Sequence, residues 1–295
     1  MFRLRYSRIV VLFFVAVFTL TAQATTINID ELSLWAGGTI GFGNTVTVGG
    51  PVASAGNISA GNGTSLSSIY TQGNLWLGNN SVVSGNVLAN GYVHTGNNVL
   101  ISGTSVSFGD FVLPPLDSLQ QNAVGTNNIY GEKYSTKTLQ PGEYRDWSFD
   151  KNVTLNLSAG EYNLKNFWMN KDGVVNIDTS LGDVVLNIAG QFDTGKSVTF
   201  TNSGSGNLFI NVFGHDAWLG ENTKLAAVVK VYGGDFGTDS SSDLSGSFYA
   251  AGNIWLGNNS QVVYSPVTVI PEPASLALFV MMGFFLSGRK SLKLG

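Results

Sequence analysis

The nonapeptide Gly73-Asn74-Leu75-Trp76-Leu77-Gly78-Asn79-Asn80-Ser81 is the clearest internal repeat of this chain. It returns near the C-terminus as Gly252-Asn253-Ile254-Trp255-Leu256-Gly257-Asn258-Asn259-Ser260, where one Leu is replaced by Ile. A looser copy reads Ala217-Trp218-Leu219-Gly220-Glu221-Asn222-Thr223. A strand-like sequence motif that recurs in this way within 295 residues indicates a repeat architecture.

Glycines around the nonapeptide recur with a period near 18 residues. One series is Gly38, Gly56, Gly73 and Gly91, and a second follows it five residues later at Gly43, Gly61, Gly78 and Gly96. The word Leu-x-x-Gly-Glu-Tyr at 139–144 is repeated 18 residues later at 157–162. This period matches one turn of a three-sided solenoid, in which each coil buries its apolar side chains only against its neighbours.

We therefore predict an all-β fold, a parallel β-helix (β-solenoid) with about 18 residues per coil. The expected number is about 13 coils, less whatever an interruption of the period uses, in a rod of about 50–60 Å. The residues do not determine the handedness of the coil. We expect a right-handed one, and the strict hexapeptide pattern of the left-handed form is absent. The alternative is a β-sandwich, which also has many short strands but requires neither a fixed period nor recurring words.

Residues 111–145 interrupt the period and separate two sets of coils, 25–110 and 146–268. After the Pro114-Pro115 pair, residues 117–123 are compatible with one or two turns of helix. We expect the interruption to pack on the outside of the solenoid or across its end. The alternative is a linker between two domains.

The composition excludes several kinds of chemistry. Charged residues make up 12% of the chain, compared with about 25% in ordinary domains. There is no Cys, which excludes disulfides, thiol redox chemistry and thiolate–metal sites. Residues 25–269 carry 9 Lys and Arg against 18 Asp and Glu, a net charge of −9, so nucleic acid is not an expected partner.

The N-terminus has the three parts of a secretory signal peptide. Arg3, Arg5 and Arg8 precede an apolar run at 9–20, and Ala22-Gln23-Ala24 forms a small-x-small cleavage site. Residues 1–24 are therefore expected to be removed. The alternative, a membrane anchor, is disfavoured because 12 apolar residues are short for a span of about 20.

A second targeting signal, after the signal peptide, occupies residues 269–295. Pro271-Glu272-Pro273 is followed by an apolar run at 276–287 and by Arg289-Lys290. This order resembles the PEP-CTERM sorting signal of Gram-negative bacteria, although the basic cluster is short and 291–295 extends beyond it. The resemblance implies processing by an exosortase in the inner membrane and delivery to the cell surface or an extracellular polysaccharide matrix. The alternative is an ordinary C-terminal anchor, which does not account for the Pro-Glu-Pro. The middle of the chain more weakly resembles Gly-rich β-helical domains of bacterial surface proteins.

No constellation of residues indicates a catalytic or metal centre. His94 and His215 lack a second His or a Cys nearby and are expected in solvated turns. Residues 233–239 loosely match a Ca²⁺-binding nonapeptide, but an extra residue disturbs its register and no second copy follows. A Ser-His-Asp triad has no supporting local motif. We therefore predict neither enzymatic activity, nor a cofactor, nor a metal.

Trp76, Trp218 and Trp255 share one position in the repeat, two residues before a glycine, and Trp168 and Tyr92 are candidates for the same position. Apolar residues flank Trp76 and Trp255 on both sides. Because successive side chains of a strand alternate between faces, the flanking Leu and Ile residues would fill the core and the Trp rings would face solvent as a ladder. The alternative is a buried stack, since a coil corner can disturb the alternation.

The sequence leaves three functions open. The first is an exported structural or adhesive protein that associates with exopolysaccharide in a biofilm or with other copies of itself. The second is a carbohydrate-binding module that uses the Trp ladder, because aromatic faces suit sugar rings. The third is a polysaccharide lyase or hydrolase.

Overall fold

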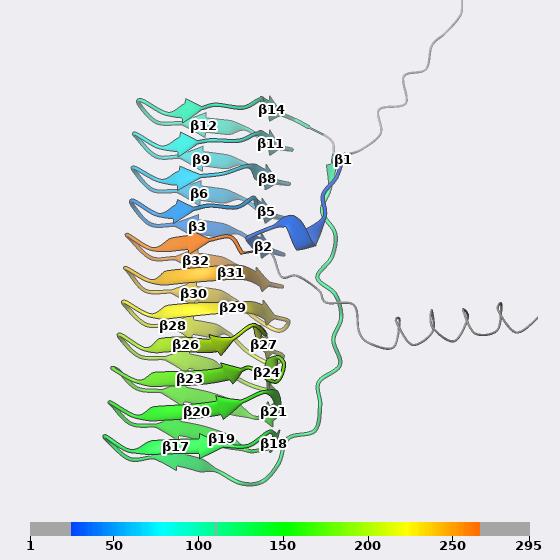
Figure 1. Cartoon of the computed structure of the whole chain (residues 1–295). Helices are drawn as coiled ribbons and strands as arrows, with labels where there is room; N and C mark the ends of the chain where they lie inside the picture. Colours follow the sequence, from blue (N-terminus) through cyan, green and yellow to red (C-terminus); the bar gives the residue numbers. More distant parts are fainter. Residues whose placement is uncertain (1–24, 110, 266–295) are drawn as a thin grey trace, which may run out of the picture.

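The computed structural model describes residues 25–109 and 111–265, and it shows a β-solenoid built from three-sided coils (Figure 1). Neighbouring coils pair as parallel strands in register, as predicted. Register partners are separated by 17 to 20 residues in most coils, and two coils are longer. Within the described ranges the stack has eleven coils, which agrees with the expected number of about 13 less the residues that the interruption and the two longer coils use.

The first side of the solenoid is a sheet of eleven described strands. In the order of the stack they are β16 (Ile129–Gly131), β19 (Asp146–Phe149), β22 (Asn166–Met169), β25 (Phe192–Thr194), β28 (Ala217–Leu219), β30 (Phe236–Thr238), β32 (Ile254–Leu256), β3 (Ile40–Phe42), β6 (Ile58–Ala60), β9 (Leu75–Leu77) and β12 (Val93–Thr95).

The second and third sides join into one larger sheet, because two long strands run across both. The second side contains β17 (Thr136–Leu139), β20 (Thr154–Ser158), β23 (Val174–Thr179), β26 (Thr199–Gly204), β29 (Lys224–Val231), β31 (Asp243–Ala250), β33 (Gln261–Val263), β4 (Thr47–Val48), β7 (Ser65–Leu66), β10 (Val82–Val83) and β13 (Leu100–Ile101). The third side contains β18 (Gly142–Glu143), β21 (Gly160–Leu164), β24 (Val184–Ile188), β27 (Leu208–Val212), the ends of β29 and β31, β2 (Leu34–Ala36), β5 (Val52–Ser54), β8 (Ile69–Thr71), β11 (Val87–Ala89) and β14 (Ser105–Ser107). Outside the coils lie β1 (Thr25–Thr26), the 3-10 helix η1 (Ile29–Glu31) and β15 (Phe111–Val112).

The coils do not stack in the order of the sequence. The last coil of the chain (orange in Figure 1) lies directly against the first N-terminal coil (blue), so β32 pairs with β3 and β33 with β4. The N-terminal coils therefore form one half of the rod, and residues 129–263 form the other half.

One coil at the middle of the rod is assembled from both ends of the described chain. The C-terminal part supplies its first and second sides, β32 and β33, and β2 supplies the third side by pairing with β31. Ile254 opposes Ile40, Val262 opposes Val48, and Phe248 opposes Leu34. We call this coil, β32–β33–β2, the shared coil.

Residues 113–128 connect the two halves as a strap along the outside of the third side (Figure 1). β15 pairs with β1, and the ring of Phe111 and the side chain of Leu113 pack in a small cluster with Trp35 and Tyr249. Further along, the Asp117 carboxylate lies 3.8 Å from Lys230 Nζ, and Asn122 Nδ2 donates to Glu161 Oε1 at 2.6 Å.

The structure of the interruption, residues 111–145, differs in two ways from the expectation based on the sequence. No helix forms at 117–123, because the segment packs on the third side in an irregular conformation that suits its prolines. The coils resume at Ile129 instead of 146, with β16, β17 and β18 forming the first coil of the lower half. The segment is not a linker between two domains, since one continuous apolar core runs through both sets of coils.

Within a coil, four features of the nonapeptide each meet a separate structural requirement, which explains why the motif is repeated. The side-chain oxygen of Asn57 accepts from the Asn74 N–H at 2.8 Å, one step in a ladder between neighbouring coils. Leu75 and Leu77 are buried. A Cβ at Gly78 would lie 2.6 Å from the backbone of Gly61, so this corner admits glycine alone. Ser81 is also buried and pairs with the Thr64 hydroxyl at 2.9 Å.

The corner between the first and second sides needs one residue with a left-handed backbone in each coil. Asn is the commonest choice, because it tolerates this conformation better than most residues with a side chain. The φ angles lie between 56° and 67° at Tyr134, Asn152, Asp172, Ser197, Asn222, Ser241, Asn259, Thr45, Gly63, Asn80 and Asn98.

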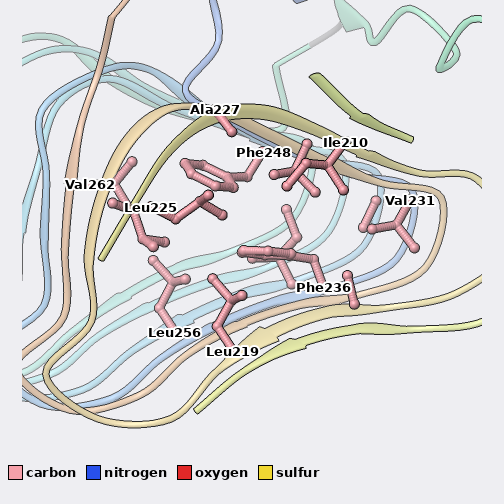
Figure 2. Packing of buried hydrophobic residues seen from close by; sticks show 14 of the residues in the cluster. Ile210, Leu219, Leu225, Ala227, Val231, Phe236, Phe248, Leu256 and Val262 are labelled. Carbon is pink, nitrogen blue, oxygen red and sulfur yellow. The ribbon is translucent and has the colours of Figure 1, made fainter. Parts of the chain in front are cut away.

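The interior is filled by the inward residues of all three sides. Figure 2 shows Phe236 and Phe248 meeting from different sides, with ring centroids 5.1 Å apart, beside Leu219 and Leu256. Because each coil buries its apolar residues only against the coils next to it, the shared coil carries the core from one half of the rod to the other. Among the described residues, no helix has the length and apolar character needed to cross a membrane.

The Tyr249 hydroxyl links β31 to the N-terminal segment, lying 3.2 Å from Leu32 O and 3.3 Å from Ile29 O. Burial raises the pKa of Tyr249 to about 12. Between pH 10 and 12 the folded protein therefore holds this proton more tightly than the unfolded chain does, so stability falls as the pH rises.

We expect Tyr249→Phe to cost about 1 kcal/mol at pH 8 through the lost hydrogen bond, and this deficit to shrink above pH 10. Urea unfolding of both proteins between pH 8 and 11.5 measures the difference. A deficit that stays constant across this range would contradict the raised pKa.

Candidate functional site

One residue of every strand on the first side points away from the core, and these residues form one line along the rod. We call this line the central column. Register pairing places its members in the order Tyr130, Ser148, Trp168, Asp193, Trp218, Gly237, Trp255, Gly41, Ser59, Trp76 and His94.

The Trp residues of the central column face solvent. The exposed fractions are 39% for Trp76, 37% for Trp218 and 52% for Trp255, while the residues on either side of each are buried. The alternation argument from the sequence is therefore confirmed, and these corners do not disturb it.

Trp168 and Tyr92 were the two further candidates for this repeat position, and the structure places them differently. Trp168 belongs to the central column and is 44% exposed. Tyr92 does not, because it lies two residues before the column, where its N–H bonds to Asn74 at 2.8 Å. His94 occupies the column in that coil and stacks on Trp76, with ring centroids 5.5 Å apart and planes 8° apart. His94 is thus an exposed strand residue, not the turn residue that was expected, whereas His215 lies exposed in a turn.

Glycine provides the surface on which two of the Trp rings lie. A Cβ at Gly237 would be 2.0 Å from the Trp218 ring, and one at Gly41 would be 2.1 Å from the Trp255 ring. Both glycines are buried although they face outward. Each ring therefore covers the glycine of the next coil, and its other face is available to solvent.

A hollow of about 410 Å³ opens on this side of the rod between Trp168 and Trp218. Asp193 lies between the two rings in the central column, with Gln191 and Asp216 at the edge. Gln191 Nε2 donates to Asp193, and the Trp218 indole N–H donates to Asp239 Oδ1 at 3.2 Å. The hollow thus combines two aromatic walls with polar groups that are held in place.

Burial raises the pKa of the Asp193 carboxyl, and the negative charge of Asp216 raises it further. The hollow is lined by two acidic side chains, Asp193 and Asp216, and by no cation among the described residues. Hydroxyl and amide donors suit such a site.

The two aspartates of the loose calcium match at 233–239, and the nearby Asp243, do not converge. Asp235 bonds to the Asn253 N–H at 2.7 Å in the corner ladder, and Asp239 bonds to Trp218. Asp243 lies on the second side, where it accepts from Gln261 at 2.8 Å. Over residues 25–109 and 111–265, no group of three or more His, Asp or Glu residues is placed to hold a metal ion.

The processing signals belong to parts of the chain outside the described residues. These are the cleavage residues Ala22 and Ala24, the motif Pro271-Glu272-Pro273 and the basic pair Arg289-Lys290.

We predict that Gly237→Ala will lift the Trp218 ring from the sheet and leave the solenoid intact, because the ring is at the surface and free to move outward. Acrylamide quenching of Trp fluorescence should increase while the far-UV circular dichroism stays unchanged. Ser59→Ala, at an outward position of the same column, is the control. Equal quenching in the two variants would show that the ring does not rest on Gly237.

The comparisons with known proteins are limited. No protein-family model and no curated protein matches the chain. Among solved structures, an ice-binding protein from the Antarctic ascomycete Antarctomyces psychrotrophicus is 12% identical with a TM-score of 0.40, covering 81% of this chain and 97% of that protein. An ice-binding protein from an Antarctic bacterium, Flavobacteriaceae, is 8% identical with a TM-score of 0.31, covering 82% and 98%. The sheets and registers described above establish the fold without these distant likenesses.

Proposed function

We propose that this protein is an exported adhesive protein of the bacterial surface that binds polysaccharide through the central column. The observation that carries the proposal is that Trp168, Trp218, Trp255 and Trp76 lie in a single line on one flat side of the rod with their rings exposed. Exposed aromatic faces are costly in water, and sugar rings cover them well.

The two targeting signals support an extracellular role. A signal peptide would take the chain across the inner membrane, and the Pro271-Glu272-Pro273 tail would bring it to an exosortase and then to the surface or the matrix. The fold suits this location, because eleven described coils form a stiff rod without any disulfide.

The proposal is binding without catalysis. Most enzymes that hydrolyse a glycosidic bond use a pair of carboxyl groups that flank the bond, one of which donates a proton. Near the central column, Asp239 holds the Trp218 indole, and Asp193 accepts from Gln191. These contacts suit groups that position a ring and bind hydroxyls.

Replacement of all four column Trp residues by Ala is expected to abolish retention on the exopolysaccharide of the producing cell. A ring that covers about 60 Å² contributes about 1.5 kcal/mol, or about tenfold in Kd, and several rings on one chain act together. Affinity electrophoresis in gels that contain the purified polysaccharide measures the effect.

Tyr134→Ala is the matched control, because this ring is 70% exposed but lies off the column. The circular dichroism of the four-Trp variant checks its fold. Full retention by that variant would refute the role of the column.

The C-terminal tail, residues 269–295, allows a separate test. Ala substitution of Pro271, Glu272 and Pro273 is expected to leave the unprocessed protein in the membrane fraction, because the exosortase would no longer recognise it. Cell fractionation with intact mass measurement tests this, and Pro266→Ala serves as a control outside the motif. Normal processing of the motif variant would argue against the sorting signal.

A further inference from the structure

Three Trp residues of the central column are separated by the same distance. Register pairing runs from Trp168 to Asp193 to Trp218, and from there to Gly237 and Trp255. Each Trp is thus two coils from the next, or about 9.6 Å at the usual strand spacing. Trp76 departs from this pattern, because Gly41 and Ser59 place it three coils beyond Trp255.

Resting on the proposed function, we infer that the ligand is an extended, uncharged β-linked polysaccharide lying parallel to the solenoid axis. One sugar covers each of Trp168, Trp218 and Trp255, and the sugar between the first two enters the hollow above Asp193 and Gln191.

The direction of the glycan follows from the line of the rings. A chain that crossed the coils would meet one ring of the column, whereas a chain along the axis meets all of them. In a two-fold β-linked chain, successive sugars turn over, so every second sugar presents the same face. Rings on every second coil therefore contact equivalent faces of such a chain, about one disaccharide apart.

The hollow determines what the intervening sugar can be. Its carboxylates accept hydrogen bonds from hydroxyl groups, and the amide of Gln191 both donates and accepts. A uronate or a sulfated sugar would place a second negative charge beside Asp193 and Asp216, which is unfavourable. The nearby Lys196 does not offset this repulsion, because it is paired with Glu221 at 2.8 Å.

Trp76 provides an internal control within the same column. Its exposure of 39% is close to that of Trp218, but it is out of phase with the other three rings. A short oligosaccharide that fits Trp168, Trp218 and Trp255 would not reach it in the same register.

Isothermal titration of the protein, purified from its producing cells, with β-1,4-linked glucose and N-acetylglucosamine oligomers of two to six units tests the inference. Affinity should rise until the oligomer reaches from Trp168 to Trp255, at about five units, and then level off. Trp168→Ala, Trp218→Ala and Trp255→Ala should each weaken binding about tenfold, whereas Trp76→Ala, three coils beyond Trp255, should weaken the binding of these short oligomers less. β-1,4-linked glucuronate oligomers of equal length, which keep the linkage and add a carboxylate to each sugar, should bind more weakly than the neutral ones.

Asp193→Asn tests the hollow and should weaken binding of the neutral oligomers about tenfold. Its fold is not at risk, because the raised pKa of Asp193 means that its charge is disfavoured in the folded protein, so unfolding should require the same or more denaturant at neutral pH.

The outcomes separate the two proposals. The inference is wrong and the proposed function stands if the four-Trp variant loses the polysaccharide and any one of four results is found. These are normal binding by Asp193→Asn, an affinity that does not depend on oligomer length, equal effects of Trp76→Ala and Trp218→Ala, or tightest binding of the β-1,4-linked glucuronate oligomers. Binding of the polysaccharide without binding of any oligomer leads to the same conclusion. If the four-Trp variant retains the polysaccharide, both fail.

Discussion

The shared coil is the contact on which the rest of the rod depends. β32 and β33 come from the end of the described chain and β2 from its beginning, so residues more than 200 positions apart complete one turn of the solenoid. Neither half can bury its apolar end without the other at this point. Such distant pairing predicts slow folding, because the chain must close a very long loop before these contacts form.

The shared coil also makes the binding side continuous. Trp255 belongs to the C-terminal part of the chain, and the glycine under its ring, Gly41, belongs to the N-terminal part. The strap makes this arrangement feasible, because it takes the chain from one end of the rod to the other outside the third side, away from the central column. The connection that reverses the order of the coils thus leaves the aromatic side uncovered.

The local features of a coil could be read from the sequence. The alternation of Leu75, Trp76 and Leu77 indicated an outward Trp, and the glycine series marked the corners. The order of the coils could not be read, because the coils share one inward pattern and the partners in the shared coil are more than 200 residues apart. Trp168 was only a candidate because its strand, Asn166–Met169, lacks the Gly-Asn frame of the nonapeptide. The sequence of the strap was compatible with a short helix. Its irregular conformation could not be predicted, because the residues against which the strap packs are distant in sequence.

The role of Gly41 and Gly237 was hidden for a similar reason. Neither glycine lies in a repeat segment that contains Trp. The function of each becomes clear only in the structure, where the strand register places it beside a Trp ring of the neighbouring coil.

From Tyr130 to Gly41, large and small residues alternate along the central column for a physical reason. Coils are about 4.8 Å apart, which is less than the length of an indole ring, so a ring that lies flat on the sheet must extend over the neighbouring position. Glycine there allows Trp218 and Trp255 to recline and present one face to solvent. Where the neighbour is another ring, as at Trp76, His94 lies parallel to the indole and takes part of its surface. A Trp in every coil would give more aromatic area but fewer free faces, so a flat binding surface requires the small residues as much as the Trp residues.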